Sequence, residues 1–123
     1  MGTYRDLTVW QKSMTLAHRI YEITARYPEE ERYGLVSQMR RCSVSIPSNI
    51  AEGYGRETER EHTHFLLISL GSSNELETQL ILSYDFQYVA QQDYQEVIDL
   101  NSEVNKMLSS LIYTLKHPDL NNS

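Results

Sequence analysis

The sequence is poor in the residues that interrupt helices or cross-link chains, with one cysteine, three prolines and five glycines among 123 residues. A single cysteine, Cys42, excludes an internal disulfide and a cysteine-based zinc site. The longest apolar run is Phe65–Ile68, which is too short for a membrane-spanning helix. The polar start, Met1–Asp6, lacks the apolar stretch of a signal peptide. We therefore expect a cytoplasmic protein.

Positive charge is also scarce, and it is unevenly distributed. The net charge is −6, from 11 Lys and Arg against 17 Asp and Glu. Residues 1–60 carry 9 Lys and Arg against 8 Asp and Glu, whereas residues 61–123 carry 2 against 9. An acidic chain is a poor general binder of nucleic acid, because affinity for phosphates comes from cations. The length predicts one domain, over residues 1–123.

Apolar residues recur with the period of an α-helix through most of the chain. Together with the few glycines and prolines, this spacing predicts helices over about residues 7–27, 35–54, 58–84 and 93–116. Four such helices joined by short loops are typical of an all-α fold, the antiparallel up-down-up-down four-helix bundle.

Local signals indicate where these helices begin and end. We expect Asp6 to cap the first helix. The spacing of Thr58 and Glu61 predicts a reciprocal capping box at the start of the third. Gly53 or Gly55 is expected to end the second helix in a left-handed conformation.

The first and third predicted helices carry more apolar surface than one small bundle can bury, and on the third Leu67, Ile68 and Leu82 extend the apolar surface around most of the helix. The first has two adjacent apolar stripes: one consists of Trp10, Met14, Ala17, Tyr21 and Thr24, and the other of Val9, Leu16, Ile20, Ile23 and Tyr27. The second helix carries apolar residues on the face opposite its core line, namely Val44, Pro47 and Ala51. Excess apolar stripes are typical of subunit contacts, so the pattern predicts a homo-oligomer. The alternative is a monomer with a broad hydrophobic rim.

No arrangement typical of an enzyme stands out in the sequence. Glu59 and His62, like Glu61 and His64, have the spacing of di-iron ligands, but they start a helix and no other helix supplies their counterparts. Cys42 lies on the apolar line of its helix, which favours packing over reactivity. We expect no catalytic residues, metal or cofactor.

One line of cations is a candidate for contact with nucleic acid. Arg5, Lys12, Arg19 and Arg26 recur every seven residues, close to two helical turns. Together with Arg40, Arg56 and Arg60 they form the candidate nucleic-acid-binding set. The alternative is a solvated helix face.

A polar stripe beside the apolar line of the second predicted helix is the other candidate site. It consists of Gln38, Arg41, Ser45, Asn49 and Glu52. Half-buried polar groups need hydrogen-bond partners. The stripe is therefore interpreted as a polar subunit contact, as an inter-helix network that fixes register, or as a ligand groove.

The segment from Gln38 to Gly53 contains the pattern Q-x-R-R-x-x-x-S-I-x-x-N-I-A-E-G. It resembles the signature of the four helix bundle protein family, which includes proteins encoded by intervening sequences in bacterial 23S ribosomal RNA genes. Further matches are Asp6-Leu7-x-Val9-Trp10, Gly71-Ser72 with Glu75-Leu76-Glu77, and Lys106-Met107-Leu108. Within the signature, Arg40, Arg41, Ser45, Asn49, Glu52 and Gly53 match residue by residue.

This resemblance implies an antiparallel four-helix subunit in a ring, a homopentamer, with no catalytic residues. The accessory variability proteins of diversity-generating retroelements are similar in fold, and they are basic pentamers that bind nucleic acid and a reverse transcriptase. The present chain is acidic instead.

We accordingly expect a non-enzymatic bacterial scaffold or interaction module that binds itself, with RNA or a ribonucleoprotein as a further candidate partner. No membrane partner or small-molecule substrate is expected. The alternative is an accessory protein that binds RNA or DNA through a basic face of the first two helices.

Overall fold

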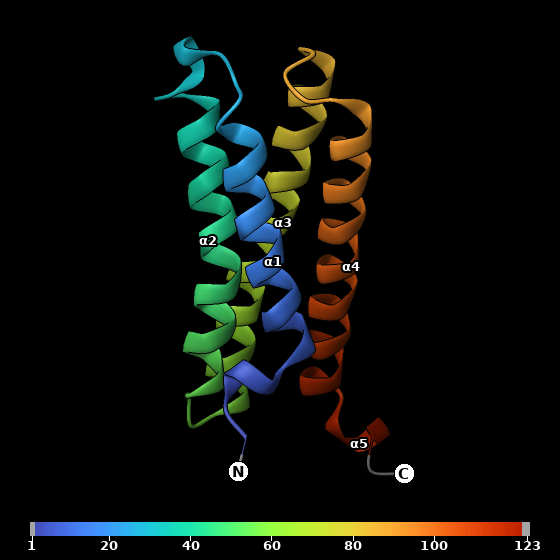
Figure 1. Ribbon diagram of the computed structural model, residues 1–123. Helices are drawn as coiled ribbons and strands as arrows, with labels where there is room; N and C mark the ends of the chain where they lie inside the picture. The colour runs from blue at the N-terminus through green and yellow to red at the C-terminus, as the bar shows by residue number, and fades with distance from the viewer. Residues whose placement is uncertain (1, 122–123) are drawn as a thin grey trace.

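The computed structural model describes residues 2–121, and within them it shows four long helices and no strand. Their bounds are α1 Thr8–Thr24, α2 Leu35–Tyr54, α3 Glu59–Asp85 and α4 Gln91–Lys116. Short helices accompany them: η1 Tyr4–Asp6, η2 Glu29–Glu31 and α5 Pro118–Asn121. Successive long helices run in opposite directions along the bundle (Figure 1). The predicted all-α four-helix bundle is confirmed.

The first predicted helix is shorter than expected, and its predicted cap is wrong. Asp6 belongs to η1, where its carboxylate accepts a hydrogen bond from the Thr3 N–H at 2.9 Å. The residue before α1 is Leu7, which offers no side-chain cap. At the other end, the Thr24 hydroxyl donates to the Ile20 carbonyl at 2.6 Å, in the last turn of α1.

At the end of α2 and the start of α3, the predicted signals were right in part. The Thr58 hydroxyl accepts from the Glu61 N–H at 3.1 Å and starts α3 as predicted. The second bond of the predicted capping box, from the Thr58 N–H to the Glu61 carboxylate, is not formed within residues 2–121. The prediction that a left-handed glycine ends α2 is wrong, because Gly55 ends this helix at φ −86°. The left-handed residue is Gln87, at φ 64° in the turn between α3 and α4. There the Tyr88 N–H donates to the Ser83 carbonyl at 2.9 Å, in the pattern of a Schellman turn.

The core takes one of the two apolar stripes of α1 and leaves the other outside. Its members from α1 and α2 are Val9, Leu16, Ile20, Ile23, Val36, Met39, Cys42, Ile46 and Ile50, and those from α3 and α4 are Leu66, Leu76, Leu80, Val97, Val104, Leu108 and Ile112. Of the other α1 stripe, Trp10, Met14 and Ala17 are half-buried and Tyr21 is exposed, whereas Thr24 is buried. The excess apolar surface noted in the sequence is therefore real.

Polar groups inside the bundle join α3 to its neighbours. The Ser69 hydroxyl donates to the Ile46 carbonyl of α2 at 2.9 Å. The Ser73 hydroxyl donates to the side-chain oxygen of Asn101 in α4, also at 2.9 Å. Because each buried group accepts only a few partners, such bonds fix how the helices are aligned along the bundle axis.

Within residues 2–121, no helix is both long and apolar enough to cross a membrane.

Candidate nucleic-acid and subunit interfaces

Three of the four cations in the predicted line, Lys12, Arg19 and Arg26, contact α4 along its seam with α1. Lys12 forms an ion pair with Glu103 at 2.8 Å. Arg19 contacts Glu96 at 2.9 Å and Asp93 at 3.3 Å, and Arg26 contacts Asp93 at 3.5 Å. The acids of α4 therefore neutralise three of the four cations that the spacing aligned.

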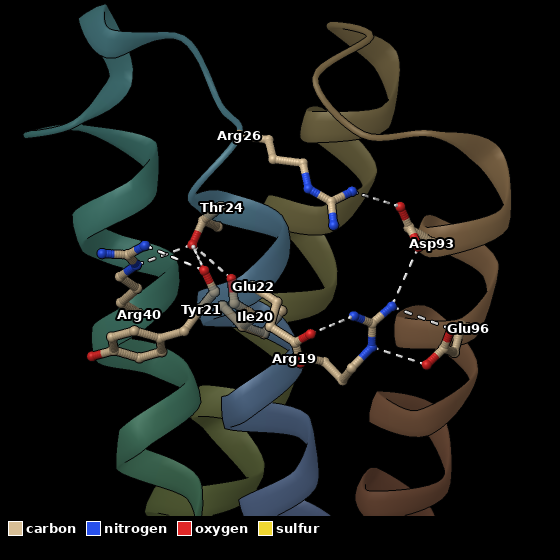
Figure 2. Close-up of polar contacts among 9 residues, drawn as sticks. All are labelled: Arg19, Ile20, Tyr21, Glu22, Thr24, Arg26, Arg40, Asp93 and Glu96. Carbon is tan, nitrogen blue, oxygen red and sulfur yellow. Dashed lines mark hydrogen bonds and ion pairs between the residues drawn. The ribbon is translucent and has the colours of Figure 1, made fainter.

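Arg19 is the most enclosed member of this line. Its guanidinium lies between Glu22 of its own helix and the two α4 carboxylates (Figure 2). Its side chain is only 19% exposed. The hydrogen bond that Arg19 donates to Glu96 raises the pKa of Arg19 from its ordinary value, and burial opposes this effect. An arginine held by three carboxylates is poorly available to a phosphate.

Arg40 extends from α2 to the end of α1, away from that seam (Figure 2). Its guanidinium donates to the Thr24 hydroxyl at 3.0 Å and to the Tyr21 carbonyl at 3.3 Å. It also lies over the Tyr21 ring, 4.6 Å from the centroid. Arg40 thus joins α2 to the last turn of α1, where the Tyr21 carbonyl also accepts the Ala25 N–H.

The remaining predicted cations lie neither along the α1–α4 seam nor beside Arg40. Arg56 forms an ion pair with Glu52 and lies 4.7 Å from the centroid of the Phe65 ring. Arg5 in η1 and Arg60 in α3 are exposed, and neither forms an ion pair within residues 2–121. The structure therefore distributes the seven predicted cations over separate places.

The polar stripe of α2 forms part of a hydrogen-bond network with α3. The Asn49 amide donates to the Ser45 carbonyl at 2.9 Å and to its hydroxyl at 3.1 Å. That hydroxyl also receives a bond from Ser72 of α3 at 2.9 Å. Glu52, the last residue of the stripe, forms its ion pair with Arg56. These hydrogen bonds support the interpretation of the stripe as an inter-helix network that fixes the register of α2 and α3.

Beside this network, the same stripe borders a shallow hollow of about 410 Å³ between α2 and α3. Its lining consists of Gln38, Arg41, Cys42, Ser45, Ser72 and Glu75. Ser72 and Glu75 belong to α3, and the helical periodicity did not predict that they would lie beside the α2 stripe. Only the packing of the two helices brings them together.

Cys42 is buried, as its position on the apolar line of α2 predicts. Its thiol donates to a carboxylate oxygen of Glu75. Burial, followed by this bond and the negative charge of Glu75, raises the pKa of Cys42 to about 12. The thiol is therefore neutral at physiological pH, which makes it a poor nucleophile.

At pH 8 we expect a thiol-specific reagent to label Cys42 at least about 100-fold more slowly in the folded protein than in denaturant, because the thiolate is suppressed. The rate of labelling, followed by absorbance, checks this. The folded-state pKa lies above the unfolded one, so the neutral thiol favours the fold below the unfolded pKa of about 8.5, and this contribution disappears as pH rises through about 12. Equal rates in the two states would contradict the burial and the bond to Glu75.

An apolar groove of about 550 Å³ lies between α1 and α2, on the outside of the bundle. Its lining consists of Tyr4, Trp10, Met14, Ala17, His18, Tyr21, Val44, Pro47, Ser48 and Ala51. The sequence identified most of these residues as two surplus apolar stripes, one on each helix, without placing them in one groove. We refer to this set as the α1–α2 groove.

Helix α3 carries a second apolar surface that the core does not use. Leu67, Ile68, Ile81 and Leu82 are each about 40% exposed. Between the two pairs lies Gly71, where an added Cβ would meet no atom within 4 Å. We call these five residues the outer face of α3.

Comparison with known proteins gives a family and a related structure. Residues 5–110 match the family described as 23S rRNA-intervening sequence protein. A similar solved structure is the crystal structure of a protein of unknown function from the S23 ribosomal protein family from Bacteroides thetaiotaomicron. The two chains are 29% identical with a TM-score of 0.78, over 85% of this chain and 98% of the other. No curated protein matches the chain significantly.

Proposed function

Because the chain belongs to the 23S rRNA-intervening sequence protein family, we propose that it is a non-enzymatic scaffold of the bacterial cytoplasm that assembles with copies of itself into a ring of five. The observation that carries this proposal is the apolar surface left outside the core, on the α1–α2 groove and on the outer face of α3. Contiguous exposed apolar surface of this kind is typical of protein–protein contacts. The protonated, buried Cys42 supports the non-enzymatic part.

Light scattering after size exclusion tests the assembly. At micromolar concentration we expect a mass of five times the 14.4 kDa chain. Dilution and moderate salt should leave that mass unchanged, because apolar contacts resist salt screening. A mass of one chain at micromolar concentration would defeat the proposal of self-assembly.

The alternative function is binding of RNA or DNA, and the exposed Arg5 and Arg60 favour it because no acid of the described chain pairs with them. The acids of α4 hold Lys12, Arg19 and Arg26, so few cations are available to phosphates. Two contacts on a single strand give a slope of about −1.4 in a plot of log K against log salt.

Fluorescence anisotropy of a labelled single-stranded RNA across a salt series tests this alternative. We expect weak binding with that shallow slope, abolished in the Arg5→Ala, Arg60→Ala double variant and kept in an Arg32→Ala control, which removes an exposed arginine outside the candidate set. Absence of binding at about 50 mM salt, where the phosphate term is strongest, would exclude the alternative.

A further inference from the structure

The two apolar surfaces that the core leaves outside face in different directions. The α1–α2 groove opens between the first two helices. The outer face belongs to α3, which packs against α2 and α4. One copy therefore cannot bring both surfaces into contact with the same neighbour at once. Two unlike surfaces that bind each other give a head-to-tail contact, which repeats from copy to copy and closes into a ring when the rotation allows it.

The shapes of the two surfaces fit each other. The groove is a concave, largely apolar channel between two helices. At about 100° per residue, Leu67, Gly71 and Leu82 fall within about 60° of one another on α3, so they lie on one narrow ridge, on which the short polar side chains of Asn74 and Thr78 are also exposed. Gly71 keeps the middle of that ridge low, since nothing projects from its Cα. Such a helix face fits a groove by inserting apolar side chains between two helices.

Charge favours the pairing of unlike surfaces over the pairing of like ones. Helix α2 has a net charge of +1, from two arginines and one acid, whereas α3 has five acids and one arginine, a net charge of −4. The two cations of α1, Lys12 and Arg19, are already paired with acids of α4, so the positive charge on this side comes from α2. Within residues 2–121, Glu77 and Asp85 of α3 form no ion pair, and neither does Arg41 of α2. An α3 helix is thus attracted to the α1–α2 side of another copy and repelled by another α3.

We propose that the outer face of α3 of one copy docks into the α1–α2 groove of the next, so that the subunits associate head to tail. This inference rests on the self-assembly proposed above and adds the two surfaces that meet. The occupant of the groove is a second copy of this chain.

Mixing two assembly-deficient variants tests the pairing. Val44→Glu places a charge in the groove, and Leu82→Glu places one on the outer face; both side chains are about 40% exposed, so neither change disturbs the core. We expect each variant alone to have the mass of one 14.4 kDa chain by light scattering. Mixed in equal amounts, they should form a dimer of one copy of each, because one intact groove and one intact outer face remain. Such a mixture cannot extend beyond two copies.

Controls separate the proposed contact from damage to the fold. Tyr33→Glu removes an aromatic residue that is 86% exposed and lies in neither surface, so it should keep the wild-type mass. Circular dichroism at 222 nm confirms the helix content of every variant. If either variant loses helix content, Ala51→Glu and Leu67→Glu replace the pair, since they lie in the same two surfaces.

Each unfavourable outcome has its own meaning. Variants that keep the wild-type mass would overturn the assignment of the surfaces while leaving the self-assembly intact. Two monomeric variants that do not combine would show that the surfaces do not bind each other. A wild-type chain that is itself monomeric at the same concentration would defeat the self-assembly proposal instead.

Discussion

Replacing Asn101 with leucine is expected to lower the free energy of unfolding by about 2 kcal/mol, because it leaves buried polar groups without partners. Asn101 is only 1% exposed, in the interface between α3 and α4. Its amide donates to the Ser73 carbonyl at 3.0 Å, and its oxygen accepts from the Ser73 hydroxyl at 2.9 Å. Leucine has the same number and branching of side-chain heavy atoms but can form neither bond.

Urea unfolding followed by circular dichroism, at one fixed protein concentration, measures this change. Adding Ser73→Ala to Asn101→Leu should recover part of the loss, since the second substitution removes the buried hydroxyl that has lost its acceptor. Asn105→Leu is the matched control. Asn105 is half-buried and reaches Ser73 at 3.1 Å, so water can replace its bonds and the loss should stay below about 1 kcal/mol. A change below about 0.5 kcal/mol for Asn101→Leu would contradict the importance of the network.

Gly53→Ala is expected to destabilise the protein by about 2 kcal/mol, although alanine is the better helix former. Gly53 lies in the last turn of α2, where α3 approaches closely. A Cβ at this position would lie 2.9 Å from the Cβ of Phe65 and 3.2 Å from the carbonyl oxygen of His62. Neither atom is the end of a flexible side chain, so relief requires the two helices to move apart.

Gly55→Ala gives the matched control for this prediction, two residues away. Its φ of −86° suits any residue, and the nearest atom to an added Cβ is the Glu52 carbonyl oxygen at 4.0 Å. We expect it to change the free energy of unfolding by less than about 0.5 kcal/mol. Thermal unfolding of both variants at equal concentration decides the matter. Equal stability of the two would show that the approach of α3 to Gly53 is not tight.

Helix number and helix start sites follow closely from the sequence, because the signals are local. The bounds of α2 are the predicted ones, and Thr58 starts α3 as expected. Asp6 failed as a cap because Thr3 recruits its carboxylate into η1, a competition between neighbours that the cap rule ignores.

The candidate sites were only half predictable. The residues of the α1–α2 groove are apparent as surplus apolar positions, but their union depends on which faces of the two helices meet. Three of the four cations in the predicted line lie together along α4, whereas Arg5 lies apart in η1, and acids far along the chain pair with those three. Arg19, for example, bonds to Glu96, 77 residues away.

The helical class, the number of long helices and the positions of the apolar residues follow from the amino-acid sequence alone. Those properties depend on periodicity and on short-range bonds, which neighbouring residues settle. The tertiary structure alone decided which charges are paired, which polar groups meet and which apolar stripe stays outside. The acids of α4 neutralise Arg19 and Lys12 because α4 packs against α1, whereas in the described part of the chain no cation forms an ion pair with Glu77 or Asp85 of α3. Coulomb attraction acts over a few ångströms, so its outcome depends on packing and not on composition.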